Sequence, residues 1–325
     1  MDARPVSFPA ADGYPLHGFV WQHLDTAARR PVVLINPATS VRCRYYHRFA
    51  AYLHAHGFDV LCYDYRGIGE SRPARLETLD AGWLEWGRLD CEGALRHALT
   101  LDGGPRPVQV VGHSVGGFLI GLAPSSAQVE RVFSMGAQYA HWRDYAPGRR
   151  LELLFKWHLV MPALTRLRGY FPGNSLGWLE DTPRGVVHDW TARHPRFEDT
   201  WRRGPRRLPA AERAALAAGF GRLRGPTLAL SVSDDEFGTI PAIRRLLAYY
   251  THSPRTHLHI HPSSIGEAAI GHFAFFHSRY STNLWPLALH WLQEGRLLPS
   301  PAGELRQWPA EHPPISVPAT SAAGC

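Results

Sequence analysis

The most informative stretch of the chain is Val108-Gln109-Val110-Val111-Gly112-His113-Ser114-Val115-Gly116-Gly117-Phe118-Leu119-Ile120. Its apolar beginning predicts a buried strand, and its apolar end predicts a helix. Between them Gly112, Ser114 and Gly116 form a G-x-S-x-G pattern, which in this strand–turn–helix setting is typical of a sharp turn that exposes a nucleophilic serine. The amide of Val115, at the start of the helix, would then face a developing oxyanion. The alternative is a glycine-rich turn whose serine has no chemical role.

The chain on either side of this turn alternates between extended and helical patterns. Two extended runs flank Asp12-Gly13, which is typical of a hairpin. Further strands are predicted at 31–35, 58–64, 108–111 and 129–135, and helices at 45–56, 84–99 and 115–122. Strands that alternate with helices pair in parallel, so the sequence predicts an α/β fold with a mostly parallel central sheet flanked by helices.

The alternation is interrupted once. Residues 140–224 are rich in Trp, Arg, Pro and Gly and show helical stretches at 151–159 and 210–218 but no clear strand. This segment is too long for a loop, so we expect an inserted helical cap. The pattern then resumes with strands at 227–232 and 256–260 and helices at 241–250 and 280–292. We therefore expect a core made of residues 1–139 and 225–297, followed by a flexible Pro/Ala/Ser/Gly-rich tail at 298–325.

The composition excludes several classes of protein. Of 325 residues, 45% are hydrophobic and 19% are charged, which is typical of a globular core and excludes wholesale disorder. No apolar run reaches the ~18 residues of a membrane-spanning helix, and the first residues lack the apolar centre of a signal peptide. Four dispersed cysteines indicate free thiols in a reducing compartment, so we expect a cytoplasmic protein.

The net charge is +7, from 35 basic and 28 acidic residues, and Lys156 is the single lysine. Scattered, solvated arginines are the simplest explanation, and no nucleic-acid-binding motif accompanies them, so no nucleic acid partner is expected. The alternative is a mouth that attracts an anionic substrate. The residues behind that alternative are the arginines and tryptophans of the cap, namely Trp142, Arg143, Arg149, Arg150, Trp190, Trp201, Arg202, Arg203, Arg206 and Arg207.

A serine nucleophile needs a base, and the base needs an orienting carboxylate. After a turn of this type the expected chain order is serine, acid, histidine, with the acid and the histidine each following a strand. The acid falls within Asp234-Asp235-Glu236, just after the strand at 227–232. Asp235 is favoured, Asp234 is second and Glu236 third. Turn and capping roles would also explain these carboxylates, and one Asp can cap while the other orients the base.

The base is assigned to His272, one of 19 histidines, because it follows Gly271 and comes after the strand at 256–260. His113 lies within the serine turn, and its side chain is expected to point away from that of Ser114. The other histidines singled out are His257, His259 and His261, which alternate along a strand. We expect them to pack or to face solvent, and we expect no metal site.

The second oxyanion donor is expected in the loop Asn36-Pro37-Ala38-Thr39-Ser40, which follows the strand at 31–35. Proline has no N–H, so Pro37 cannot donate. Ala38 is the favoured donor, and Thr39 is the alternative.

Four motifs together resemble the serine α/β-hydrolase superfamily over residues 6–295. They are Gly112 to Gly117, Asp235, Gly271-His272, and the run from Phe58 to Ser71. The last run contains Asp64-Tyr65-Arg66-Gly67-Ile68-Gly69-Glu70-Ser71, which is similar to the D-x-R-G-x-G-x-S signature of the lipase, esterase and peptidase branches. The resemblance implies an α/β-hydrolase fold with a cap over the substrate cavity, and structural roles for Arg66 and Ser71.

Within the superfamily the chain resembles the bacterial predicted α/β hydrolases with a serine-aminopeptidase or lysophospholipase-like core. A serine at the turn, in place of aspartate, separates it from haloalkane dehalogenases and epoxide hydrolases. Many relatives carry His-Gly before the oxyanion residue, whereas this chain carries Asn36-Pro37.

These observations predict a cofactor-free serine hydrolase that cleaves a carboxylic ester or thioester of a small-molecule acyl substrate. Ser114, Asp235 and His272 would form the catalytic triad, and the amides of Val115 and Ala38 would bind the oxyanion. The same triad would also serve an acyltransferase, and a non-catalytic binding protein with this fold is the third hypothesis.

Overall fold

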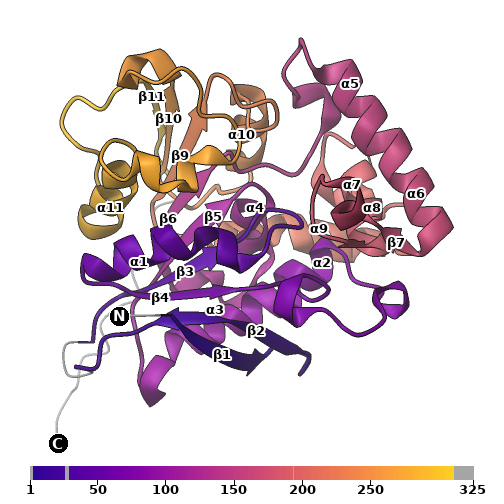
Figure 1. The fold of residues 1–325 in the computed structure, drawn as a ribbon, viewed down its shortest axis with the longest axis horizontal. Helices are drawn as coiled ribbons and strands as arrows, with labels where there is room; N and C mark the ends of the chain where they lie inside the picture. Colours follow the sequence, from indigo (N-terminus) through magenta and orange to yellow (C-terminus); the bar gives the residue numbers. More distant parts are fainter. Residues whose placement is uncertain (1–2, 26–28, 193, 311–325) are drawn as a thin grey trace, which may run out of the picture.

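The computed structural model describes residues 3–25, 29–192 and 194–310. Its centre is a nine-stranded sheet with the strand order β1-β2-β4-β3-β5-β6-β9-β10-β11 (Figure 1). The strands are β1 (Arg4–Pro9), β2 (Pro15–Trp21), β3 (Val32–Asn36), β4 (Asp59–Tyr63), β5 (Val108–His113), β6 (Val129–Met135), β9 (Thr227–Val232), β10 (Arg255–Ile260) and β11 (Glu304–Trp308). From β4 to β10 neighbouring strands are parallel, and antiparallel pairs complete both edges.

The expected α/β fold is therefore present, and the first two strands form the expected hairpin. The helices are α1 (His47–Ala55), α2 (Trp83–Glu85), α3 (Glu92–Leu99), α4 (Val115–Leu122), α5 (Arg150–Phe155), α6 (Met161–Arg168), α7 (Gly173–Leu176), α8 (Arg184–Thr191), α9 (Ala210–Gly219), α10 (Ile240–Leu247) and α11 (Trp285–Glu294). One π-helical turn, Trp86–Cys91, joins α2 to α3, and another, Lys156–Val160, joins α5 to α6.

Helices cover both faces of the sheet, which explains why its central strands are apolar at almost every position. In β3, Val32 and Leu34 pack into one core with α3, α4 and α10. The alternate residues Val33 and Ile35 pack into a second core with α1 and α11. Because the carboxyl ends of the parallel strands meet at one edge of the sheet, residues that follow β5, β9 and β10 come close together there.

The segment 140–224, which we call the cap, lies between β6 and β9 in the chain and contains α5 to α9. Its first helices, α5 to α8, lie together on one side of the sheet, to the right in Figure 1. No strand was predicted in this segment, but Tyr170–Phe171 (β7) and Thr182–Pro183 (β8) form a short antiparallel pair. Two residues per strand are too few to produce a readable alternation.

The structure corrects the expectation of a flexible tail at 298–325. Residues Glu304–Trp308 form β11, which pairs with β10 at the edge of the sheet. Its residues are exposed except for Trp308, which is half-buried against the core. An edge strand with so little burial is held by backbone hydrogen bonds and lacks the apolar pattern that identifies buried strands. Residues 311–325 lie outside the described residues.

The cysteines and the lengths of the helices bear on two further expectations from the composition. Cys43, Cys62 and Cys91 are buried free thiols, and Cys325 lies outside the described residues. Within the described ranges, each helix is too short or too polar to cross a bilayer.

Candidate active site

Ser114 occupies the turn between β5 and α4 with backbone angles of φ 52° and ψ −121°. This conformation is strained for a residue with a side chain and costs on the order of 1–3 kcal/mol. The two flanking glycines permit it, because a Cβ at Gly112 would lie 2.5 Å from the backbone of Gly117 and a Cβ at Gly116 would lie 2.1 Å from the carbonyl oxygen of Asn36. The turn thus has the geometry that the G-x-S-x-G pattern predicts.

Asp235 and His272 form a buried pair beside this turn. His272 Nδ1 lies 2.7 Å from Asp235 Oδ2, and Asp235 Oδ1 accepts hydrogen bonds from the amides of Phe237 and Gly238, each at 2.8 Å. Burial alone would raise the pKa of Asp235, but His272 and the two amides outweigh it and hold that pKa below its usual value. An ionised carboxylate can only accept hydrogen bonds, so His272 donates from Nδ1. Its Nε2 then carries the lone pair that can accept a proton.

The three acidic candidates after β9 have three different partners. Asp234 Oδ2 accepts hydrogen bonds from the amides of Ile270 and Gly271, at 2.7 and 3.0 Å, and so holds the loop that carries His272. Glu236 pairs with Arg149 at 3.2 Å. Only Asp235 contacts the imidazole of His272, and the geometry therefore favours it as the orienting acid.

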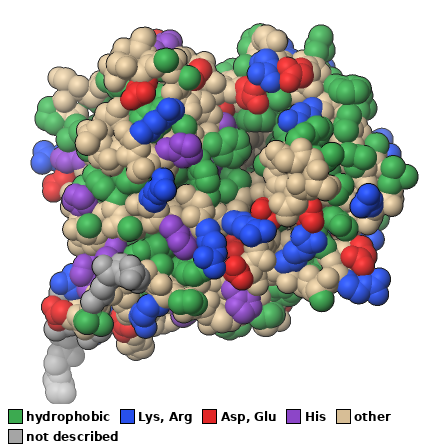
Figure 2. All heavy atoms as spheres, viewed as in Figure 1, with side chains coloured by type: hydrophobic (Ala, Val, Ile, Leu, Met, Phe, Trp, Pro, Cys, Tyr) green, Lys and Arg blue, Asp and Glu red, His purple; other side chains and the backbone are tan. Residues whose placement is uncertain are grey.

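Ser114 and His272 line one cavity of about 160 Å³ between the carboxyl edge of the sheet and the cap. Figure 2 shows a hollow with hydrophobic side chains between the core and the cap. The other lining residues are Ala38, Thr39, Trp83, Val115, Gln138, Ala140, Lys156, Trp157, Trp178, Leu179, Trp190, Glu236, Phe237 and Phe273. Six of these sixteen lining residues are tryptophan or phenylalanine, so the walls are rich in aromatic side chains.

Gln138, which the sequence analysis missed, contacts the serine directly. Its side-chain Nε2 donates to Ser114 Oγ at 3.3 Å, while its Oε1 accepts from the amide of Ala140. Because the serine oxygen accepts this bond, its own proton stays available for a base. The residue follows β6, where a lone glutamine in an irregular segment carries no motif that would have marked it.

The two predicted oxyanion donors differ in whether their amides already have a hydrogen-bond acceptor. The amide of Val115 is at the first position of α4, where a helix leaves N–H groups without intrahelical partners. The amide of Ala38, by contrast, donates to the hydroxyl of Tyr46 at 2.9 Å. The sequence could not show this bond, because it depends on how α1 and the turn before it pack beneath the loop. Thr39, the alternative donor, also lines the cavity.

His113 points away from Ser114, as expected, into a buried hydrogen-bonded chain. Its Nδ1 lies 2.7 Å from the hydroxyl of Tyr46, and its Nε2 lies 2.9 Å from the carbonyl oxygen of His272. Burial and the neighbouring His272 lower the pKa of His113 to about 3, so the ring is neutral at physiological pH. The chain of bonds connects the Ala38 loop with the backbone of His272.

Arg66 and Ser71, from the run Asp64 to Ser71, have structural partners. Arg66 forms ion pairs with Asp12 and Asp90, and Ser71 Oγ donates to the carbonyl oxygen of Asp64. These contacts agree with the structural roles that the resemblance implied.

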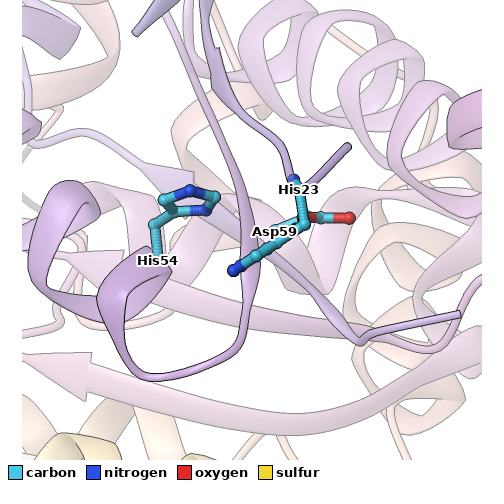
Figure 3. Close-up of side chains that lie close together, drawn as sticks. All are labelled: His23, His54 and Asp59. Atoms are coloured by element: carbon cyan, nitrogen blue, oxygen red, sulfur yellow. Dashed lines mark hydrogen bonds and ion pairs between the residues drawn. The ribbon is translucent and has the colours of Figure 1, made fainter. Parts of the chain in front are cut away.

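His257 and His259, which the sequence suggested for packing, both contact the hydroxyl of Ser231, at 2.7 and 2.8 Å. Among the described residues, a grouping of potential metal ligands occurs elsewhere, at His23, His54 and Asp59 (Figure 3). There Asp59 Oδ1 accepts from His23 and Oδ2 accepts from Arg106 at 2.5 Å. With both oxygens engaged and an arginine beside them, the carboxylate is already neutralised as part of an ion-pair network.

The positive charge of the cap lies mostly away from the cavity. Of the cap arginines and tryptophans considered above, Trp190 alone is among the cavity's lining residues. On the face shown in Figure 2, basic and acidic side chains are interspersed. The basic group that does reach the cavity is Lys156, which the sequence analysis noted only as the single lysine.

Solved structures with similar folds include enzymes of several kinds. The Pyrococcus furiosus esterase Pf2001 is 12% identical, with a TM-score of 0.54 over 90% of this chain and 91% of the esterase. The DcsB protein, solved with its substrate analogue, is 17% identical, with a TM-score of 0.54 over 90% and 99% of the two chains. The thioesterase domain from the curacin biosynthetic pathway is 15% identical, with a TM-score of 0.50 over 89% and 100%. At these identities the similarity establishes the fold alone.

No curated protein matches the sequence. A family model does match it, over residues 16–281, which is most of the chain and includes the serine turn, the acidic triplet and His272. Together with the sheet order and the helices on both faces, this match shows that the chain belongs to the alpha/beta hydrolase family, which supports a hydrolase activity on a small-molecule substrate.

Proposed function

We propose that the protein is a serine hydrolase that cleaves a carboxylic ester or thioester through an acyl-enzyme on Ser114. The observation that carries the proposal is the convergence, at one cavity, of a strained serine and a histidine whose Nδ1 is bonded to a buried, ionised aspartate. A serine hydroxyl is a weak nucleophile, and this arrangement supplies the base that activates it.

The reaction would proceed in two halves. Ser114 Oγ attacks the acyl carbon and passes its proton to His272 Nε2, while Asp235 stabilises the imidazolium. The tetrahedral intermediate collapses, and the alcohol or thiol leaves with the proton from His272. Water then attacks the acyl-enzyme, again giving its proton to His272, and the free acid departs as the serine is reprotonated.

The oxyanion would be bound by the amide of Val115 and by a second amide from the loop after β3. Ala38 is the first candidate and would have to exchange its bond with Tyr46 for one to the oxyanion. Thr39 is the alternative, and its residue lines the cavity as well. One such donor contributes about 10²–10³ in turnover.

The size of the cavity indicates a short acyl group. At about 160 Å³ it is smaller than the ~300–1,000 Å³ of cavities that hold drug-sized ligands. We therefore expect acetyl to butyryl esters to be cleaved faster than decanoyl esters, as rates on a series of 4-nitrophenyl esters would show.

Active-site labelling tests the nucleophile. A fluorophosphonate should add to the wild-type protein, as detected by intact mass, and should fail to add to Ser114→Ala. Ser278→Ala, a change at an exposed serine outside the cavity, is the matched control and should label normally. Equal labelling of the wild type and Ser114→Ala would overturn the proposal, and so would complete inactivity across a panel of esters and thioesters. Acyl transfer to an added alcohol in preference to water would reassign the second half-reaction to an acyltransferase.

A further inference from the structure

Lys156 is the single lysine of the chain, and it lines the same cavity as Ser114 and His272. It contributes to the wall formed by the cap, together with Trp157, Trp178 and Trp190. A cationic side chain in a cavity rich in aromatic side chains is costly to desolvate unless something in the cavity, or a ligand, compensates its charge. The contacts of the ammonium group therefore indicate what the cavity binds.

The ammonium group lies against two indole rings. Lys156 Nζ is 4.2 Å from the ring centroid of Trp178 and 4.6 Å from that of Trp157. Trp157 in turn stacks on Trp190, with centroids 5.0 Å apart and planes inclined by 21°. The rings stabilise the positive charge and hold its position, but they do not neutralise it, and they leave its N–H donors available.

Glu152, one helical turn before Lys156, and Glu236, which lines the cavity, both pair with another cation. Arg149 binds both oxygens of Glu152, each at 2.7 Å, and also pairs with Glu236 at 3.2 Å. Within the described part of the chain, Lys156 forms no ion pair. The cavity therefore presents a positive charge that aromatic rings hold and that forms no ion pair with a described carboxylate, although Glu152, four residues earlier, interacts with it electrostatically.

The helix backbone is irregular at the point where Lys156 reaches the cavity. Lys156 is the first residue of the π-helical turn Lys156–Val160 between α5 and α6. A π-helical turn widens the helix and shifts the direction of the side chains, and such turns occur frequently at functional sites. Lys156 and Trp157 both reach the cavity from this turn.

We propose that Lys156 binds a carboxylate carried by the acyl group of the substrate, so that the preferred substrates are half-esters or half-thioesters of short dicarboxylic acids. This inference rests on the proposed function, because it assumes that the acyl carbon lies at Ser114. One end of the acyl group would be attacked at the sheet edge, and the other end would be held by the ammonium group on the cap. The small volume of the cavity limits the acyl chain to a few carbons.

The test compares two esters with the same leaving group, 4-nitrophenyl butyrate and 4-nitrophenyl hemiglutarate, which differ by the terminal carboxylate. Lys156→Met should lower kcat/KM for the hemiglutarate by about 10- to 100-fold relative to the butyrate, the range expected for a charge-assisted hydrogen bond. Lys156→Arg should retain part of the preference. Arg168→Met is the matched control, because it removes one positive charge from an exposed position on α6 and should leave the ratio unchanged. Equal losses on both esters in Lys156→Met would overturn the inference.

A binding experiment separates this inference from the proposed function. In Ser114→Ala, which cannot form an acyl-enzyme, glutarate should bind measurably by calorimetry, and adding Lys156→Met should weaken the binding by a similar factor. One outcome is that glutarate binding depends on Lys156 but that fluorophosphonate does not label the protein with an intact Ser114. That outcome would support the anion site and refute the serine hydrolase. Fluorophosphonate labelling together with glutarate binding that is absent, or independent of Lys156, would refute the anion site alone.

Discussion

Two of the histidine–aspartate pairs in the molecule, each with a buried aspartate, have nearly the same contact geometry. At the carboxyl edge of the sheet, His272 Nδ1 lies 2.7 Å from Asp235; near the amino edge, His23 Nδ1 lies 3.0 Å from Asp59 (Figure 3). In both pairs burial would raise the pKa of the aspartate, and in both the partners outweigh burial and lower it. The pairs are thus alike in contact and in charge.

Their surroundings differ. Asp59 also binds Arg106, so its negative charge is compensated whether or not His23 is protonated. Asp235 has two backbone amides and His272 as its partners, so a proton gained by His272 is the charge that best compensates it. A histidine–aspartate pair becomes a base–acid pair when no other cation neutralises the acid and when a nucleophile shares its cavity. The first pair meets both conditions, which is why we propose it as the base and acid of the reaction; we call it the active pair below. The second pair belongs to an ion-pair network.

The largest effect that separates the pairs is on turnover. Asp235→Asn keeps the shape of the acid but presents an amide to His272, which favours the wrong tautomer, so kcat on a short ester should fall by about 10⁴. Asp59→Asn should leave kcat within a few-fold of the wild type and should instead lower stability, because Arg106 then remains buried without its carboxylate. Steady-state kinetics and urea unfolding of both variants check the contrast.

Asp234→Asn is the internal control for this contrast, because Asp234 is adjacent in sequence but bonds backbone amides. Its side-chain oxygen still accepts from Ile270 or Gly271, and little activity should be lost. Loss of about 10⁴ in Asp234→Asn with near-normal turnover in Asp235→Asn would reverse the assignment of the acid.

The position of the active pair was readable from the sequence because its parts lie at strand ends. An apolar run followed by Gly-x-Ser-x-Gly or by an acidic triplet is a local signal, and the parallel sheet brings those signals to one edge. The choice between Asp234 and Asp235, by contrast, could not be made from the local sequence. Neighbouring residues of a turn point in different directions, and the direction depends on the loop that carries His272.

Contacts that cross between elements were not predictable from pattern. The bond from Ala38 to Tyr46 joins a loop to the turn before α1, and Gln138 reaches Ser114 from the segment after β6. Lys156 meets Trp178 only because the cap folds back on itself. Such contacts depend on the packing of whole elements, and no periodicity in one segment encodes them.

The second-largest effect tests how tightly the active pair is packed. Gly136 has φ +58°, and a Cβ there would lie 2.8 Å from Asp235 Oδ2 and 3.0 Å from the imidazole of His272. Gly136→Ala should therefore push the pair apart and lower kcat by about 10²-fold, the cost of a displacement near 1 Å. Steady-state kinetics on a short ester measures the loss.

Gly266→Ala is the matched control, since Gly266 also has a positive φ, of +74°, but an added Cβ would meet nothing within 4 Å. It should cost a similar ~1 kcal/mol of backbone strain and leave turnover unchanged. If the two variants lose the same activity, backbone strain rather than crowding of the pair explains the effect.

The smallest effect concerns His113, the neutral histidine that contacts the backbone of His272. His113 has a pKa of about 3 in the folded protein and an ordinary value near 6.5 in the unfolded chain. Below pH 6.5 the unfolded chain binds a proton at His113 that the folded protein does not bind. The stability contributed by His113 is therefore full above that pH and declines toward pH 3.

His113→Gln, which retains a donor and an acceptor for His272 and Tyr46, lacks this titration. The difference in unfolding free energy between the wild type and His113→Gln should therefore shrink by about 1.4 kcal/mol per pH unit between pH 6 and pH 4. Urea unfolding across that range measures the difference directly. The comparison of two proteins cancels the contributions of other histidines, such as the half-buried His47 and the buried His257, whose pKa values burial also lowers. A difference that stays constant with pH would show that His113 takes up its proton in the folded state as well. Its Nδ1 would then donate to the hydroxyl of Tyr46, while its Nε2 would still donate to the carbonyl oxygen of His272.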